Sequence, residues 1–285
     1  MAPSAGGLLD RRGGGGLDPP VPRAAHPSHS QPDLMSNSSM AKRKSGGIVE
    51  TAKTIIYALL IALVIRTVAF EPFNIPSGSM IPTLLVGDYL FVSKFSFGYS
   101  RYSLPGFLQV PLSGRLFGAL PKRGDVAVFK LPRDPSIDYI KRIIGLPGDT
   151  IQMIHGQLTI NGTAVNRQPA GTYEAGGEGP TMLLKRYVET LPNGVKHYIL
   201  KASDDQPLDN TPEYKVPAGF VFAMGDNRDN SQDSRVMNAV GFIPVDNLVG
   251  RAEFIFFSID ATEPWWEVWQ WPLEIRWSRL FTGIH

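Results

Sequence analysis

Apolar residues fall into one long run near the N-terminus and several short runs after it. Residues 54–65 contain no charged side chain, and the run continues past Arg66 to Phe70. As a helix, residues 54–70 would span about 26 Å, slightly less than the ~30 Å hydrocarbon core of a bilayer, and Lys53 and Arg66 can reach outward to extend the span. We predict a transmembrane helix over residues 48–70. A cleaved signal peptide ending near Ala69 and a buried core helix are the alternatives.

Beyond residue 70 the pattern is typical of β-strands, because short apolar or alternating runs are separated by Gly, Pro, Asn and Asp. The predicted strands are Leu90–Val92, Val126–Phe129, Thr150–Ile154, Leu158–Ile160, Tyr198–Leu200, Phe220–Met224 and Ala252–Ile259. His155-Gly156 and Asn161-Gly162 predict hairpin turns. No convincing amphipathic helix is visible, so we expect a mostly β domain.

Composition divides the chain further. Residues 1–47 are rich in Gly, Pro, Ser and Ala without an apolar period, which predicts a disordered tail. Residues 71–285 are expected to form one domain. Residues 161–215 are more polar than their flanks and indicate an inserted, smaller β subdomain.

Charge distribution predicts the topology of the chain. The net charge is only +2, which gives no support to a nucleic-acid-binding protein. Residues 1–53 hold seven basic and four acidic residues, whereas the remainder holds 21 and 22. A basic flank before an apolar helix keeps the N-terminus in the cytoplasm, so residues 71–285 are expected outside. The absence of cysteine excludes disulfides, thiolate metal sites and a cysteine nucleophile.

The first segment with candidate chemistry, Phe73–Leu84, follows the apolar helix closely. Its prolines and glycine predict a fixed, extended and non-helical backbone. Ser77 and Ser79 would then project on the same side, one as a nucleophile and the other as a donor to an oxyanion. The alternative is a plain turn with solvated serines.

A serine nucleophile needs a base. None of the five histidines has a neighbourhood that suggests a Ser-His-Asp triad. A buried lysine can replace histidine, because burial disfavours the charged ammonium. Lys141 and Arg142 lie within an apolar strand, where alternation places them on opposite faces. The alternative is a lysine that faces solvent from an edge strand.

A third segment, residues 225–235, is very polar and directly follows the apolar run Phe220–Met224. A calcium loop is not supported, because Ser234 and Val240 stand where the loop pattern needs Gly and Glu. The segment is better interpreted as a hydrogen-bonded loop that supports an active site.

These three segments together resemble the sequence boxes of bacterial type I signal peptidases, also called leader peptidases. The matching stretches are PSGSM with PTL, DYIKR with GLPGD, and GDNRDNS with DSR, in that order after an apolar helix. Residues Lys122–Asp125 and the C-terminal Ser278–His285 are similar too. The resemblance covers about residues 52–150 and 215–285.

The resemblance implies a membrane-anchored β-sheet or partly open barrel and a Ser/Lys-dyad serine protease. Ser79 would be the nucleophile, Lys141 the general base, Ser77 the oxyanion donor and Ser231 the group that orients the lysine. Structural support would come from Arg142, Asp226, Asp233 and Arg235. No cofactor or metal is expected.

The expected substrate is a secretory preprotein with small residues at positions −1 and −3 before the cleaved bond. The −1 pocket would be lined by Ile75, Pro76, Met80, Leu84, Tyr139 and Ile140. The −3 pocket would be lined by Phe73, Leu90, Val128 and Asp138. The expected location is the bacterial inner membrane, with the catalytic domain on the periplasmic side.

All five tryptophans fall in the last 21 residues and suggest a lipid-facing surface, with a terminal structural cap as the alternative. They are Trp265, Trp266, Trp269, Trp271 and Trp277. Two other functions compete with the peptidase. A self-cleaving repressor would need a DNA-binding head in place of the apolar helix, and a catalytically inactive binding module would not need Ser79, Lys141 and Ser231 together.

Overall fold

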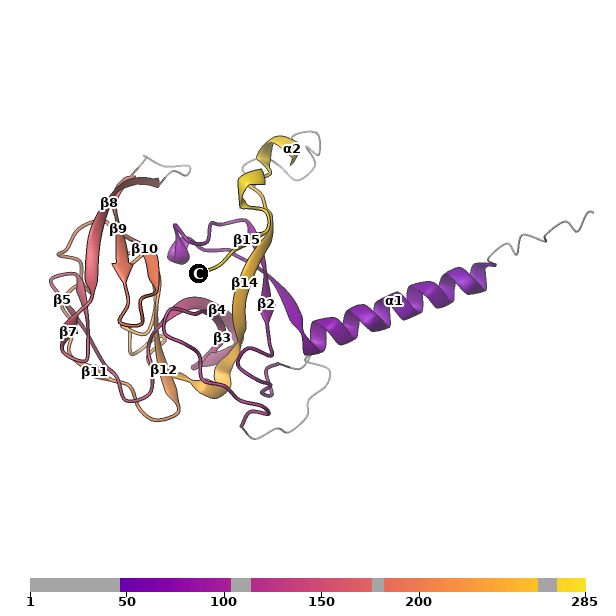
Figure 1. The fold of residues 1–285 in the computed structure, drawn as a ribbon, viewed down its shortest axis with the longest axis horizontal. Helices are drawn as coiled ribbons and strands as arrows, with labels where there is room; N and C mark the ends of the chain where they lie inside the picture. The colour runs from indigo at the N-terminus through magenta and orange to yellow at the C-terminus, as the bar shows by residue number, and fades with distance from the viewer. Residues whose placement is uncertain (1–46, 104–113, 176–181, 261–270) are drawn as a thin grey trace, which may run out of the picture. The chain divides into compact units, whose positions relative to one another are not determined.

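The computed structural model describes residues 47–103, 114–175, 182–260 and 271–285 (Figure 1). Its helices are α1 (Ile48–Val68) and α2 (Trp271–Glu274), with 3₁₀ turns η1 (Gly78–Met80), η2 (Val245–Asn247) and η3 (Trp277–Arg279). Its strands are β1 (Phe70–Asn74), β2 (Asp88–Ser93), β3 (Val126–Leu131), β4 (Asp134–Gly145), β5 (Thr150–Ile154), β6 (Gln157–Ile160), β7 (Thr163–Ala164), β8 (Asn166–Ala175), β9 (Met182–Thr190), β10 (Lys196–Lys201), β11 (Tyr214–Lys215), β12 (Phe220–Met224), β13 (Ile243–Pro244), β14 (Leu248–Ser258) and β15 (Thr282–Gly283).

The strands form three sheets, which confirms the mostly β prediction. The largest has the order β1-β2-β14-β3-β4-β12-β13, and β15 pairs with β14. It does not close into a barrel, because β1 and β13 stand at its two edges. A three-stranded sheet has the order β10-β9-β8, and a four-stranded sheet the order β11-β5-β6-β7.

The predicted strands are confirmed, each overlapping a strand of the structure. Both predicted turns are confirmed as well. His155 and Gly156 have φ of 46° and 71°, and Asn161 and Gly162 have φ of 52° and 77°. Positive φ at both central residues gives the turn the twist that two hairpin strands require.

Strand β3 shows how the core is built. Val126 and Val128 belong to one buried cluster, and Ala127 and Phe129 belong to another on the opposite face. The strand is therefore apolar on both faces, which explains why its sequence is a continuous apolar run. Each fully buried side chain of this size contributes roughly 1.5–3 kcal/mol. The first cluster also receives Met80 and Leu84, and so connects the core to the segment that carries the candidate serines.

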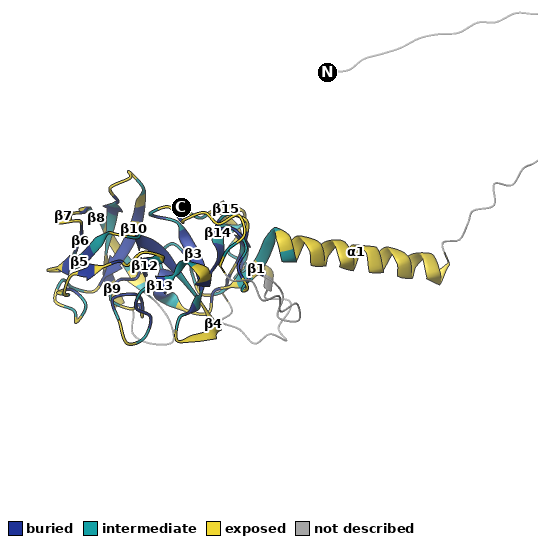
Figure 2. Ribbon diagram, turned by 90° about the horizontal axis from the view of Figure 1, so that it is seen from below, coloured by how far each residue is buried: buried dark blue, intermediate teal, exposed yellow. Residues whose placement is uncertain are grey.

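Helix α1 is exposed along almost its whole length (Figure 2). An 18-residue window within it has a mean hydropathy of 2.1, and the helix is long and apolar enough to cross a membrane. The alternative interpretation as a buried core helix is wrong, because none of the 18-residue apolar window is buried. The helix ends at Val68 instead of residue 70, since Phe70 already pairs with Ser93 in the β1–β2 ladder.

Residues 161–215 contribute β7 to β11, and their origin as an insertion stays a prediction. The disorder predicted for residues 1–47 falls outside the described residues except at Gly47. Trp265, Trp266 and Trp269 also lie outside them.

Candidate active site

Ser79 lies in the 3₁₀ turn η1, close after the edge strand β1. The prediction of a wholly extended segment is wrong here: Ser77 is extended, with φ −133° and ψ 150°, but residues 78–80 form one turn. The turn directs Met80 into the core, where its side chain is fully buried. Leu84 N donates a 2.9 Å hydrogen bond to the Met80 carbonyl and continues the compact path. Ser79 is thereby held on a short, anchored turn.

Lys141 comes from the middle of β4, where it is paired with Ala127 of β3. Its Nζ lies 2.7 Å from Ser79 Oγ and donates a 2.9 Å hydrogen bond to the Ile140 carbonyl. Both Ser79 and Lys141 are buried. The Tyr139 ring covers the amine, with its centroid 5.2 Å from Nζ. The structure therefore brings together the serine and the lysine that the sequence analysis singled out.

The environment of Lys141 favours a neutral amine. Burial lowers the pKa of Lys141 from 10.5 to about 8, although the negative charges of Asp233 and Asp226 act in the opposite direction. A lysine with a pKa near 8 is partly neutral close to physiological pH and can accept a proton. An ordinary exposed lysine could not do so to a useful extent.

Ser77 lies beside the nucleophile on the open side of the site. Its Oγ is 3.4 Å from Ser79 Oγ, and its side chain is exposed. A hydroxyl there can turn toward a charge that develops next to Ser79. This position is compatible with the predicted oxyanion role, which stays a prediction.

The loop of residues 225–235 is hydrogen-bonded to the backbone of the serine turn. Asn227 N donates a 3.1 Å hydrogen bond to the Ser79 carbonyl, and Asn227 Nδ2 donates a 3.0 Å hydrogen bond to the Gly78 carbonyl. A Cβ atom on Gly225 would lie 2.5 Å from the Ser79 carbonyl oxygen and 2.2 Å from Ser231 Oγ. Only glycine therefore allows the loop to come this close.

Ser231 is buried next to Gly225, but no hydrogen bond joins it to Lys141 among the described residues. The Ile140 carbonyl and Ser79 Oγ orient the amine in this structure instead. Ser231 Oγ is buried without a hydrogen-bond partner among the described residues, and its predicted lysine-orienting role stays a prediction.

The four predicted supporting residues form two buried ion pairs. Arg142 Nε and Nη2 donate 2.9 Å and 2.8 Å hydrogen bonds to the two carboxylate oxygens of Asp226. Arg235 binds Asp233 in the same two-point manner at 2.9 Å and 2.8 Å. Burial raises the pKa of each aspartate, but its arginine and the other groups that contact the carboxylate together outweigh burial and hold the pKa below the usual range. Breaking a buried pair of this kind typically costs about 3–5 kcal/mol, because it leaves an uncompensated charge.

A groove of about 670 Å³ opens beside the two candidate catalytic residues. Seven predicted pocket residues line it, namely Phe73, Ile75, Pro76, Val128, Asp138, Tyr139 and Ile140. Met80, Leu84 and Leu90 do not: all three are fully buried in the core cluster beneath it. Their assignment to the pockets stays a prediction, since a sequence match does not show how deep a side chain lies.

Several residues around the site were missed by sequence reasoning. Ile137, Asn230 and Gln232 line the groove, and the Tyr139 hydroxyl donates a 2.8 Å hydrogen bond to Gln232 Oε1. Alternation from Tyr139 along β4 could have indicated Ile137. Thr83 was also missed; its hydroxyl donates to Asp226 and receives a 3.3 Å hydrogen bond from Arg142 Nη2.

Comparison with known proteins agrees with this geometry. The family model described as "Signal peptidase, peptidase S26" matches residues 48–257. A signal peptidase I of Rickettsia typhi is 42% identical over 247 residues, covering 80% of this chain and 91% of the relative. One of Rickettsia canadensis is 41% identical over 251 residues, covering 82% and 92%.

A crystal structure of a signal peptidase I from Enterococcus faecalis V583 shares 24% identity and covers 47% of this chain and 97% of its own, with a TM-score of 0.28. That overlap is too weak to compare the two folds. The family model spans all three boxes, and the two sequence relatives each match at least 80% of the chain. The chain therefore belongs to the signal peptidase family, peptidase S26, and is a serine endopeptidase of the signal peptidase I type.

Proposed function

We propose that this protein removes N-terminal signal peptides from exported preproteins and uses Ser79 and Lys141 as a catalytic dyad. The observation that carries the proposal is the 2.7 Å approach of Lys141 Nζ to Ser79 Oγ in a buried site next to an open groove. The family match supports the same reaction. A self-cleaving repressor is not supported, since that match includes α1 in place of a DNA-binding head.

The proposed reaction begins with neutral Lys141, which accepts the Ser79 hydroxyl proton as Oγ attacks the peptide carbonyl. The carbonyl oxygen becomes an oxyanion, which Ser77 Oγ–H and the Ser79 backbone N–H stabilise. Each such donor typically contributes a factor of about 10²–10³. Lys141 then passes its proton to the leaving amine as the C–N bond breaks, which leaves an ester on Ser79. Lys141 next deprotonates a water that attacks this ester, and it returns the proton to Ser79 Oγ as the acyl C–O bond breaks.

The walls of the groove support a preference for an extended peptide with small residues. Strand β1 is an edge strand, paired only with β2 in its sheet, so a substrate strand can lie along the segment that follows it. Tyr139 and Ile140 of β4 form the opposite wall. We propose that a peptide with alanine at positions −1 and −3 lies between these two walls, next to Ser79.

The test is cleavage of a purified preprotein by the full-length enzyme in detergent. We expect cleavage after an Ala-x-Ala sequence, and we expect that replacing the −1 alanine with phenylalanine lowers kcat/KM by at least about 10²-fold, because the larger ring prevents the scissile carbonyl from reaching Ser79. A −2 alanine-to-phenylalanine substrate is the matched control and should be cleaved at a similar rate. Equal cleavage of the −1 variant would contradict the specificity.

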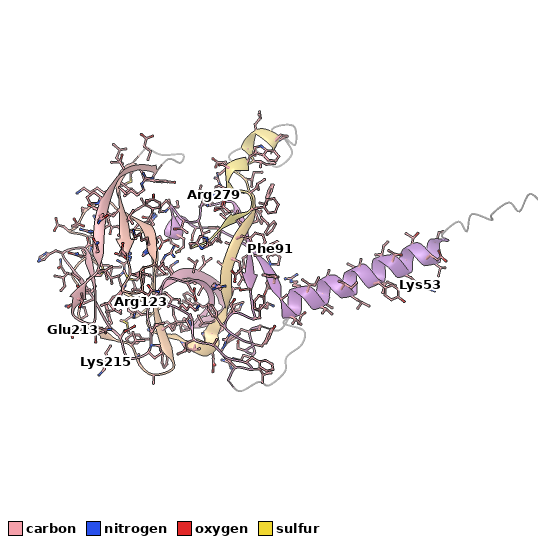
Figure 3. The ribbon with its side chains drawn as sticks, in the orientation of Figure 1. Lys53, Phe91, Arg123, Glu213, Lys215 and Arg279 are labelled. Carbon is pink, nitrogen blue, oxygen red and sulfur yellow. The ribbon has the colours of Figure 1, made fainter. Side chains whose placement is uncertain are left out.

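We further propose that α1 anchors the protein in the bacterial inner membrane with the catalytic domain on the periplasmic side. The basic residues before α1 favour this orientation. Lys53 lies in the early part of α1, near the end of the helix that is away from the β-sheets (Figure 3). Preproteins in the process of export would meet the groove on the periplasmic side.

The C-terminal tryptophans are proposed to seat the catalytic domain on lipid. Trp277 is 63% exposed, which supports a role outside the core. In a protein that lacks residues 1–70, replacing Trp265, Trp266 and Trp269 with serine is expected to weaken binding to liposomes, since tryptophan favours the headgroup region. Co-sedimentation measures the bound fraction. Unchanged partitioning of the triple variant would contradict the proposal.

A further inference from the structure

The three-stranded sheet β10-β9-β8 is connected through the backbone to the serine turn. At the end of β10, Leu200 N donates a 2.9 Å hydrogen bond to the Asp226 carbonyl, and Arg228 N donates a 3.0 Å hydrogen bond to the Leu200 carbonyl. Asn227, between these two loop residues, donates from its own N–H to the Ser79 carbonyl. Backbone hydrogen bonds therefore link β10 to the loop, and the loop to the nucleophile Ser79.

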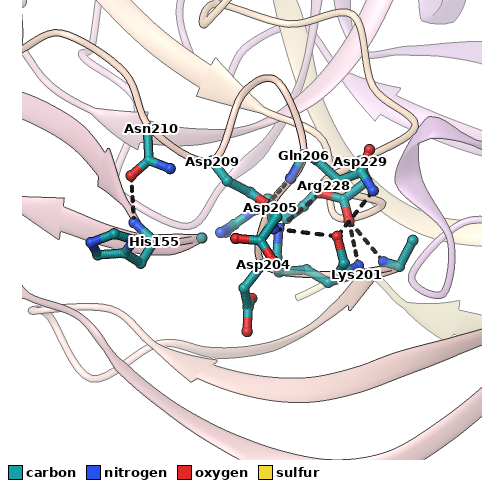
Figure 4. Close-up of polar contacts among 12 residues, drawn as sticks. His155, Lys201, Asp204, Asp205, Gln206, Asp209, Asn210, Arg228 and Asp229 are labelled. Atoms are coloured by element: carbon teal, nitrogen blue, oxygen red, sulfur yellow. Dashed lines mark hydrogen bonds and ion pairs between the residues drawn. The ribbon is translucent and has the colours of Figure 1, made fainter.

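A buried lysine at the end of β10 forms ion pairs that stabilise this connection. Lys201, the last residue of β10, is fully buried, and its Nζ contacts Asp209 Oδ1 at 2.5 Å and Asp229 Oδ1 at 2.8 Å (Figure 4). Asp229 belongs to the loop that holds Ser79. Its second oxygen accepts a 2.7 Å hydrogen bond from Ala202 N. The Lys201 ammonium thus joins the sheet to the loop at a buried site, where water cannot take over its contacts with the two carboxylates.

A second buried ion pair binds the same loop to β9. Arg228 Nη1 donates a 2.9 Å hydrogen bond to Glu189 Oε1, and Nη2 contacts Glu189 Oε2. Burial raises the pKa of Glu189, but Arg228 and the nearby His197 outweigh burial and hold that pKa well below its usual range. The Arg228 carbonyl accepts a 2.6 Å hydrogen bond from Arg235, which pairs with Asp233 near the catalytic amine.

We infer that Lys201 and Glu189 are positioning residues for the peptidase reaction: they hold the 225–235 loop, and through Asn227 they fix the place of Ser79 relative to Lys141. The inference rests on the proposed Ser79–Lys141 reaction. Most of the groove lining comes from β4 and from the segment around β1, whereas Asn230 and Gln232 come from the 225–235 loop. Loss of either positioning residue should therefore lower kcat more than it changes KM.

The experiment measures kcat and KM of the full-length enzyme on an Ala-x-Ala preprotein. Lys201→Met and Glu189→Gln are expected to lower kcat by about 10–10²-fold with KM within about twofold, because small displacements of a nucleophile have large effects on rate. Lys201→Arg, which keeps the buried charge, should recover part of the lost kcat. The folded fraction is measured by near-UV circular dichroism, and kcat is expressed per folded molecule.

Arg167→Met is the matched control. Arg167 lies in β8 of the same sheet and pairs with Asp204 at 3.0 Å, and none of its hydrogen bonds or ion pairs reaches the 225–235 loop. Its kcat should stay within about twofold of wild type. An equal loss of kcat in Arg167→Met would overturn the inference, since the effect would then belong to the sheet as a whole.

If the Lys201→Met variant does not fold, the Asp229→Asn variant tests the positioning role instead. Asp229→Asn leaves the Lys201–Asp209 ion pair intact. It should fold and lose kcat by about tenfold at unchanged KM. A folded Asp229→Asn enzyme with wild-type kcat would overturn the inference, as would a rise in KM alone. Wild-type enzyme and Ser79→Ala are run in the same assay, so a wild type that does not cleave identifies a failure of the proposed function instead.

Discussion

Lys141→Ala enzyme is expected to lose at least about 10³-fold in kcat while it remains folded. The variant removes the only group placed to take the Ser79 proton in the described part of the site, where Nζ lies 2.7 Å from Oγ. General bases contribute about 10²–10⁴-fold, and the same amine is also proposed to protonate the leaving group and to activate water. Ser79→Ala removes the nucleophile itself and should lose as much.

The double variant Ser79→Ala/Lys141→Ala provides the sharper form of this prediction. Residues that act as one catalytic unit show strongly non-additive effects, so the double variant should be no less active than either single variant. Lys215→Ala, at an exposed lysine of β11, is the matched control and should keep wild-type activity. Preprotein cleavage followed by gel electrophoresis measures all four. Robust cleavage by Lys141→Ala, or multiplied losses in the double variant, would contradict a dyad.

The predictable parts of the fold are those with a strong local signal. The apolar runs became strands because they are buried, and β3 is buried on both faces. Asn161-Gly162 predicts its turn because both residues tolerate positive φ. The hairpin of β8 and β9 was not predicted strand by strand, since most residues of β8 are exposed or half-buried and leave no apolar alternation in the sequence.

The same distinction applies to the site. The sequence boxes identify Ser79 and Lys141 as the candidate pair, because each of the two boxes carries one candidate group. The depth of Met80 and Leu90 could not be predicted, since it depends on which strands cover them. The partnership of Lys201 with Asp229 joins residues 28 positions apart from two different elements, and nothing local in either segment indicates it. Long-range ion pairs of this kind become visible only in the folded chain.

The pH dependence of the reaction follows from the burial of Lys141. Burial lowers the pKa of its amine to about 8, against the opposing effect of Asp233 and Asp226. A general base acts in its neutral form, so the active fraction is complete above this pKa and falls below it. Half of the amine is neutral at pH 8, so between pH 8 and pH 6 the rate should fall by about 50-fold, approaching about tenfold per pH unit below pH 7. A histidine base would instead lose activity around pH 6.5.

The most direct test of the dyad is the pH profile of kcat/KM for the wild-type enzyme on a preprotein whose cleavage site has no titratable side chain. In the free enzyme this quantity reports the ionisation of the essential base. We expect a rise with a slope near one and a midpoint near pH 8, as the pKa of Lys141 predicts. A profile that is flat from pH 6 to pH 9, or a midpoint near pH 6.5, would contradict Lys141 as the base that activates Ser79.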